Sequence, residues 1–393
     1  MAQSKKKKRK EGHSLDYVLL TVVLFLVGFG LLMIYSTSSY EASVDYGDAA
    51  YYLKKQLFST ILGFIVLAFI SRVPYQVWKR FDMVALVGSI VLILLVLTPL
   101  GVTRNGATRW LDLKIGLTLQ PAEVAKLGII IYLASIITKL GRSLRTFKGF
   151  MIFIIPPTFV AGLIYVITDN LSSAIIIMGI AVAMLFVAIP DYKYFIIAAV
   201  AVLALAGAVV VFASGNDVTA FRLVRIKAWL DPGKFRLARI QAWLNPESQA
   251  QDKGFQTLQA LYAIGSGGIW GKGLGQSMQK RGFLPESQND MIFSIICEEL
   301  GLFGALAVIL LFVVLIWGCM VIANNTMDQF GSLLAVGVMA HYAIQVILNI
   351  AVVTNTIPNT GITLPFISYG GSSTLFLLAE IAIVLNVSKS AKA

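Results

Sequence analysis

Long apolar runs constrain the fold of this chain more than any other feature. The runs at 17–35 and 171–189 contain no charged residue, and each approaches the roughly 20 residues that a helix needs to cross a bilayer. Backbone N–H and C=O groups cannot stay unpaired in lipid, so such runs must be helical. We therefore expect an all-α polytopic membrane protein.

Runs of this kind predict about ten transmembrane helices. They lie near 17–35, 56–70, 83–100, from Pro121 to the basic loop at 139–148, 150–168, 171–189, a seventh ending near 213, 291–322, 331–353 and 366–387. The predicted division is a basic cytoplasmic tail at 1–14, a transmembrane domain at 15–388 and a short cytoplasmic tail at 389–393. Residues 214–290 form a large extracytoplasmic loop between the seventh and eighth helices.

Positive charge supports this orientation. Residues 5–10 read KKKKRK, and the short loops near 72–80 and 139–148 are also basic, which is typical of the cytoplasmic side. The formal net charge is +12, but no soluble domain gathers it, so nucleic acid is not an expected partner. The membrane's anionic headgroups, or an anionic lipid-linked substrate, fit this charge better.

The predicted outer loop is basic although it lies on the opposite side. It contains an internal repeat, FRLVRIKAWLDPGK at 221–234 and FRLARIQAWLNPES at 235–248. Each copy has helical spacing and ends before proline, which indicates two short interfacial helices. Helices lying on anionic lipid and a bound pyrophosphate both account for the charge, and they are compatible.

Asp290 lies where a polar segment meets an apolar run that begins at Met291. One interpretation is a helix N-cap, a position that Asp favours. The other is a general base held at the bilayer surface. A helix N-terminus stabilises a carboxylate by about 0.3–1 kcal/mol. Desolvation acts in the opposite direction and can be larger, so it can leave a usable base.

Other ionisable residues lie at membrane depth, where they are costly and usually face an interior cavity. Glu123 and Lys126 are three residues apart and can pair on one helical face. We expect Glu298 and Glu299 to be structural, with buried partners such as Lys126 or Arg109. Arg109 and its neighbour Trp110 are expected to clamp an anion and to anchor the interface.

The segment 355–373, NTIPNTGITLPFISYGGSS, is too rich in glycine, proline and hydroxyl groups for a plain connection. It predicts irregular backbone that lines a cavity. His341 is expected to be a hydrogen-bonded core histidine. Cys297 and Cys319 lie in apolar runs and are expected to fill space rather than form a disulfide or bind metal. We find no zinc-ligand cluster, nucleotide loop or serine-triad motif.

Five stretches together resemble the SEDS family (shape, elongation, division and sporulation), which includes FtsW, RodA and SpoVE. They are NGATRW at 105–110, QPAEVAK at 120–126, GFQTLQALYAIGSGGIWGKGLG at 254–275, FLPESQNDMIF with EELG at 283–301, and NTGITLPFISYGGSS at 359–373. The first and last look more like the FtsW branch. The chain departs from the family at 169–173, where DNLSS replaces the usual Pro-Asp-Leu-Gly-Thr, so no catalytic role is assigned there.

The resemblance implies a bacterial plasma-membrane glycosyltransferase that polymerises lipid II into peptidoglycan strands at the division septum. It also implies a class B penicillin-binding protein transpeptidase and other division proteins as partners. Asp290 matches the family's essential aspartate and is the expected catalytic base. The expected substrate-binding or cavity residues are Arg109, Trp110, Glu123, Lys126, Glu286, Ser368 and Ser372. No metal ligand or cofactor is assigned, and dependence on a divalent cation stays open.

Two other functions use the same features. A lipid II flippase would need charges reachable from both sides of the membrane, and a division scaffold would need no catalytic acid. Because Asp290 lies at an outer boundary, the sequence favours the polymerase.

Overall fold

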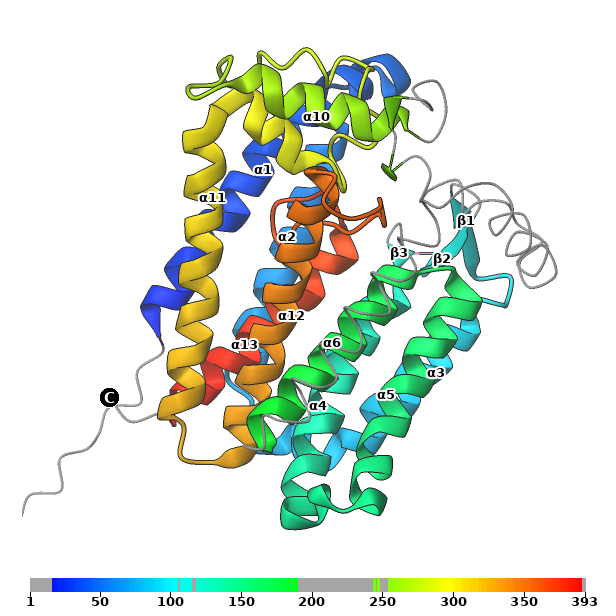
Figure 1. Ribbon diagram of the computed structural model, residues 1–393, viewed down its shortest axis with the longest axis vertical. Coiled ribbons are helices and arrows are strands. Elements are labelled where there is room, and N and C mark those ends of the chain that lie inside the picture. Colours follow the sequence, from blue (N-terminus) through cyan, green and yellow to red (C-terminus); the bar gives the residue numbers. More distant parts are fainter. Residues whose placement is uncertain are drawn as a thin grey trace, which may run out of the picture.

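The structure, a computed structural model, describes residues 16–104, 107–114, 118–189, 243–244, 246–247 and 254–390. The predicted basic tail, the seventh span and nearly all of the 221–248 repeat lie outside these residues. Most of the described chain is helical, and the long helices run side by side along one axis (Figure 1).

Eight of the described helices are long and apolar enough to cross a membrane. This confirms the prediction of an all-α polytopic membrane protein. The helices are α1 (Tyr17–Tyr46), α2 (Tyr51–Ile70), α3 (Asp82–Leu95), α4 (Pro121–Leu140), α5 (Phe147–Thr168), α6 (Leu171–Ala188), α10 (Phe255–Gly267), α11 (Ile292–Asn325), α12 (Gln329–Val353) and α13 (Gly371–Ser388), with short 3₁₀ turns at Tyr75–Phe81 and Gly141–Arg145.

Local sequence explains where several helices begin. Asp16 caps α1 by accepting a hydrogen bond from the Leu19 N–H, and Asn170 caps α6 in the same way. Pro121 occupies the first turn of α4, as predicted, where its missing N–H has no helical partner to lose.

Two span boundaries differ from the prediction. The first helix continues to Tyr46, so Glu41 lies on α1 rather than in a loop. Conversely, α3 ends at Leu95 after only 14 residues, because the chain turns at 96–100 and enters a strand.

A small three-stranded sheet stands where the sequence predicted an irregular polar loop. Its strands are β1 (Gly101–Arg104), β2 (Ala107–Asp112) and β3 (Thr118–Leu119), in the order β1-β2-β3 and antiparallel throughout. The pairing of Arg104 with Ala107 leaves a two-residue connection whose sequence is Asn-Gly, a strong hairpin signal. That dipeptide would have predicted the hairpin.

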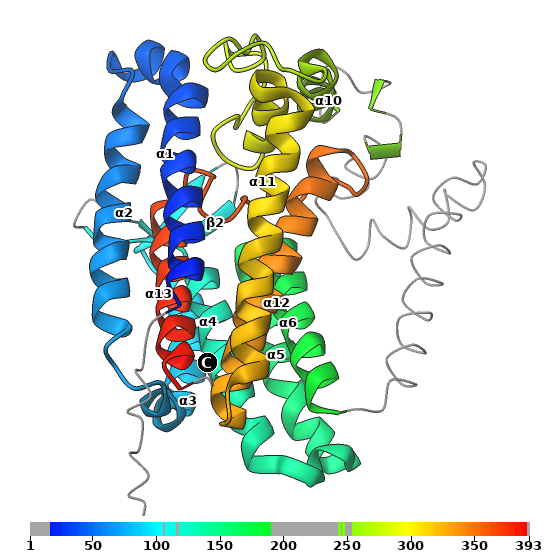
Figure 2. The ribbon, with the colours of Figure 1, turned by 90° about the vertical axis from the view of Figure 1, so that its left-hand side faces the viewer.

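The two ends of the bundle carry different elements. Figures 1 and 2 place α10 across one end, above the start of α11. Asp16 and Ser388 meet at the other end, where the Asp16 N–H donates to Ser388 Oγ over 3.2 Å. The first and last described residues therefore lie at the same end of the bundle.

The glycine-rich end of α10 packs directly on the backbone of α11. The helical path of α11 breaks at Gly301, which has φ +65°. The Leu302 N–H donates to the Gly268 carbonyl over 3.0 Å, and the Lys272 N–H donates to the Glu298 carbonyl over 2.9 Å. A Cβ on Gly267 would lie 2.0 Å from the Cys297 carbonyl oxygen, so only glycine allows this approach.

We predict that Gly267→Ala destabilises the folded protein by about 1–3 kcal/mol, the usual cost of overpacking a tight contact. Thermal unfolding of the purified protein would show a lowered Tm. The matched control is Gly265→Ala in the same helix, because a Cβ there meets nothing within 4 Å. Equal Tm values for the two variants would contradict the close packing.

Candidate active site

A cavity of about 830 Å³ lies beside the segment that precedes α11. Its walls come from α1, α2, β2, α4, α6, the segment 286–290, α12, the connection 361–370 and the start of α13. Seven of the eight predicted site residues line it: Arg109, Trp110, Glu123, Lys126, Glu286, Asp290 and Ser372. Residues from widely separated parts of the chain therefore meet at one place.

Asp290 is buried in the wall of this cavity, with 9% of its surface exposed. Helix α11 starts from Met291 as its N-cap, and no side chain caps it, so the N-cap interpretation of Asp290 is wrong. Asp290 Oδ1 is buried and has no hydrogen-bond partner among the described residues. An acceptor with this unmet capacity suits a group that receives a proton from a ligand.

Backbone hydrogen bonds hold Asp290 in place. Three successive carbonyl groups each accept one bond: Gln288 from the Tyr369 N–H (2.9 Å), Asn289 from Ser368 Oγ (2.6 Å) and Asp290 from Asn349 Nδ2 (2.8 Å). Ser368 also accepts from the Leu364 N–H over 2.8 Å. Ser368, predicted to contact the substrate or its cavity, is not among the residues that line the cavity and instead positions the backbone beside Asp290.

The environment of Asp290 changes its acidity. Burial raises the pKa of Asp290 to about 7, and the nearby Glu286 carboxylate acts in the same direction. The backbone N–H groups of Asp290 and Met291 oppose the shift. Asp290 can therefore both accept and release a proton near neutral pH, as a general base must.

Glu123 and Lys126 form a buried ion pair on α4. Lys126 Nζ lies 2.8 Å from Glu123 Oε1, so the predicted shared face is confirmed. Lys126 also donates to Gln345 Oε1 over 3.0 Å, and Ser373 Oγ donates to Glu123 Oε2 over 3.3 Å. The pair thus joins α4 to α12 and α13 at the cavity wall.

Arg109 brings a fixed cation to the cavity from β2. Its Nε donates to the Thr168 carbonyl over 3.1 Å, and its Nη2 donates to the Asp169 carbonyl over 2.7 Å. These bonds anchor the guanidinium at the C-terminal end of α5, where the helix dipole favours positive charge.

The structure adds cavity residues that the sequence analysis did not select. Lys54 and Lys55 bring cations from α2, and Glu41 brings a carboxylate from α1. Lys54 pairs with Asp48 over 2.7 Å, and Lys55 donates to the Tyr51 hydroxyl over 2.6 Å. The adjacent lysines at a span boundary were the available signal, but positive charge there also suits an ordinary membrane interface.

Glu298 and Glu299 have different partners from those predicted. Lys272 pairs with Glu298 over 2.7 Å, and Lys280 pairs with Glu299 over 2.6 Å. Pairing with Lys126 or Arg109 was therefore a wrong prediction, although the structural role holds. The local loop supplies the cations because its glycines bring it against α11.

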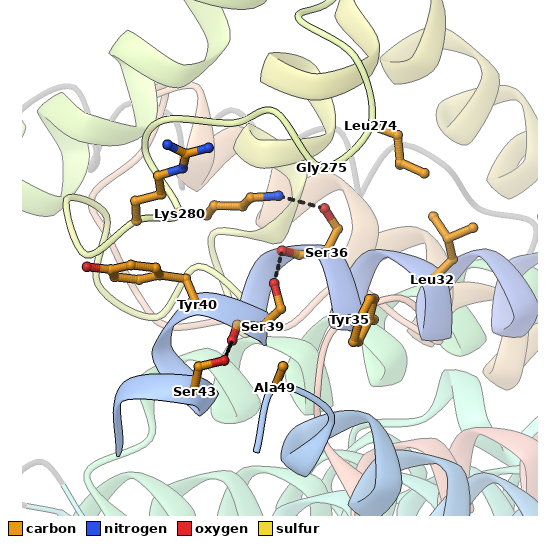
Figure 3. A pocket seen from close by; sticks show the side chains of 11 residues that line it. Leu32, Tyr35, Ser36, Ser39, Tyr40, Ser43, Ala49, Leu274, Gly275 and Lys280 are labelled. Atoms are coloured by element: carbon orange, nitrogen blue, oxygen red, sulfur yellow. Dashed lines mark hydrogen bonds between the residues drawn. The ribbon is translucent and has the colours of Figure 1, made fainter. Parts of the chain in front are cut away.

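A second pocket, of about 590 Å³, lies between α1 and the segment 274–281. Figure 3 shows Lys280 crossing toward Ser36, to which its Nζ donates over 2.9 Å. Because Lys280 is already paired with Glu299, its charge serves to fasten the loop to α1 and α11.

His341 is buried and hydrogen-bonded, as predicted. Cys297 and Cys319 are buried and free. Within the described part of the chain, no group of three His, Cys, Asp or Glu side chains lies close enough to hold a metal ion.

The site and fold together define a polytopic membrane protein with a buried carboxylate beside a charged cavity. Residues 17–393 match the FTSW_RODA_SPOVE family model, described as "Cell cycle protein". The chain belongs to this family.

Named relatives and solved structures agree with this assignment. "Stage V sporulation protein E" of Bacillus subtilis is 36% identical over 95% of this chain and 97% of its own. "Probable peptidoglycan glycosyltransferase FtsW" of Trichlorobacter lovleyi is 37% identical over 96% and 94%. Thermus thermophilus RodA has the same fold, with a TM-score of 0.67, 22% identity and coverage of 97% and 98%. A peptidoglycan synthase complex contains a chain with a TM-score of 0.75, 23% identity and coverage of 95% and 98%.

We predict that Glu123→Ala and Lys126→Ala each destabilise the protein, by about 3–5 kcal/mol if the remaining charge stays buried. The double variant should lose less than the sum of the two, because no unpaired charge remains. Thermal unfolding and folded yield measure this coupling. Additive losses would show that the two charges do not depend on each other.

Proposed function

We propose that this chain is a membrane glycosyltransferase that polymerises lipid II into peptidoglycan glycan strands. The observation that carries the proposal is Asp290, a buried carboxylate with an unpaired oxygen at the wall of a cavity that also presents cations. The names of the relatives, which include peptidoglycan glycosyltransferases, support it. The family membership and the cavity supply a common frame for the steps below.

Asp290 acts as the general base. It removes the proton from the 4-hydroxyl of the acceptor's GlcNAc as that oxygen attacks C1 of the donor's MurNAc. The bond between C1 and the pyrophosphate oxygen breaks, and undecaprenyl pyrophosphate leaves with the bonding electrons. The cavity must therefore hold a neutral sugar beside Asp290 and a polyanion close to it.

Cations of the cavity stabilise the pyrophosphate. Arg109 is fixed by two backbone carbonyls and Lys126 by a buried carboxylate, so neither must reorganise when charge develops on the leaving group. Lys54 and Lys55 add positive charge at the same cavity. Trp110, Glu286 and Ser372 line its wall and contact the sugar or the peptide.

The proposed partners are lipid II, a class B penicillin-binding protein transpeptidase and other division proteins. The similar synthase structure is titled for its coordination of polymerization and crosslinking, which supports a transpeptidase partner. We place the protein in the bacterial plasma membrane, at the septum. Sequence identity is equally high to a sporulation relative, at 36%, and to FtsW of Bacillus subtilis, also at 36%, so the septal role rests on the proposal.

We predict that Asp290→Asn abolishes most polymerisation, by roughly 10²–10⁴-fold, because an amide cannot take the acceptor's proton. The variant should fold normally, since Asn has nearly the same volume and the Asn349 bond goes to the backbone of residue 290. The measurement is glycan-chain formation from lipid II by purified protein with its transpeptidase. Thermal stability and partner binding serve as controls.

Near-normal polymerisation by the Asp290→Asn variant would remove Asp290 as the base. Lipid II translocation without polymerisation by the wild-type protein would favour the flippase, and the absence of both activities would favour the scaffold.

We predict that polymerisation rises with pH through an apparent pKa near 7. Only ionised Asp290 accepts a proton, so below that value kcat/KM should fall about tenfold per pH unit. Glu286→Gln removes a carboxylate that raises the pKa of Asp290, and it should move the midpoint to lower pH. A flat profile between pH 5.5 and 8 (about two units around the midpoint) would contradict titration of Asp290.

We predict that both termini are cytoplasmic and that 214–290 is extracytoplasmic. Single cysteines at Ser248 and Ser390, in a chain with Cys297 and Cys319 replaced, report the two sides. An impermeant maleimide applied to intact cells should label the first and not the second. The reverse labelling pattern would place Asp290 on the wrong side for polymerisation.

A further inference from the structure

A line of buried polar side chains continues from the cavity into the helical bundle. Lys126 on α4 and Gln345 on α12 line the cavity, and Lys126 Nζ donates to Gln345 Oε1 over 3.0 Å. His341 Nε2 lies 2.8 Å from the same oxygen, one helical turn deeper on α12. His341 Nδ1 lies 2.8 Å from Glu380 Oε2 on α13. No member of this line is more than 1% exposed.

The orientation of the Gln345 amide decides where His341 carries a proton. Gln345 Nε2 donates to the Thr363 carbonyl over 3.0 Å, so its Oε1 is the atom that faces Lys126 and His341. A carbonyl oxygen can only accept, and therefore His341 Nε2 must donate. The imidazole thus carries N–H at Nε2, which leaves Nδ1 to face Glu380.

The contact between His341 and Glu380 must contain one further proton. Without it, two acceptors would lie 2.8 Å apart. The proton resides on Nδ1 or on the carboxyl group, and the pair is neutral overall in both cases. Glu380 Oε1 is buried with no partner among the described residues, and an ionised carboxylate with an unsolvated oxygen is costly. This favours neutral imidazole beside a carboxylic acid.

We propose that His341 and Glu380 are positioning residues that hold Gln345, and through it Lys126, at the cavity. Lys126 has two observed acceptors, Glu123 and Gln345, and together they set the place of its ammonium group. The inference rests on the proposed function, in which Lys126 stabilises the departing pyrophosphate. A shift of this cation of about 1 Å would weaken that stabilisation, because catalytic groups tolerate little displacement.

The test compares Glu380→Gln with Glu380→Leu. A glutamine amide can donate to Nδ1 of a neutral imidazole, so Glu380→Gln should polymerise lipid II at nearly the wild-type rate. Leucine cannot donate, and Glu380→Leu should lower kcat about tenfold or more while KM changes little. His341→Leu should match Glu380→Leu, and the double variant should be no worse. Ile381→Val, also fully buried on α13, controls for altered packing.

A second measurement does not depend on activity. The chain has two histidines, so His13→Ala protein labelled with ¹⁵N-histidine reports His341 alone. Its spectrum should show Nε2 protonated and hydrogen-bonded, with that signal altered in Gln345→Leu. An unprotonated Nε2, or equal kcat for Glu380→Gln and Glu380→Leu, would overturn the positioning role. Wild-type protein that fails to polymerise lipid II would reject the proposed function instead, while the ¹⁵N spectrum would still test the hydrogen-bonded line.

Discussion

The attachment of residues 288–290 to α12 and its connection to α13 is the interaction on which the site depends. Three consecutive carbonyl groups are held by donors more than 50 residues later in the chain. Lipid offers no alternative hydrogen-bond partner, so these backbone groups must find partners within the protein. The irregular segment 354–370 provides them, and it thereby fixes Asp290 against the cavity.

A second set of contacts secures the same end of the molecule. Backbone packing between α10 and α11 leaves room only for glycine, and Lys272 and Lys280 neutralise Glu298 and Glu299 beside it. These pairs compensate buried charge locally. Asp290 has no such ion pair among the described residues, and the raised pKa of its carboxyl group follows from that difference.

Much of the fold could be predicted because membrane insertion depends on local composition. Apolar length located most of the helices, and Pro121 located the start of α4. The prediction failed where short-range chemistry was overlooked or ambiguous. Asn105-Gly106 indicated a hairpin that was taken for a loop, and the polar end of α1 resembled a connection although its backbone stays helical.

The sequence by itself determined the all-α membrane fold, the pairing of Glu123 with Lys126 and the position of Asp290 at the start of an apolar run. Each depends on neighbours within one or two helical turns. Only the tertiary structure decided that Ser368 supports the backbone, that Glu299 pairs with Lys280, and that His341 joins Gln345 to Glu380. Helix spacing states which face a residue occupies, but the partner on another helix depends on how the whole bundle packs.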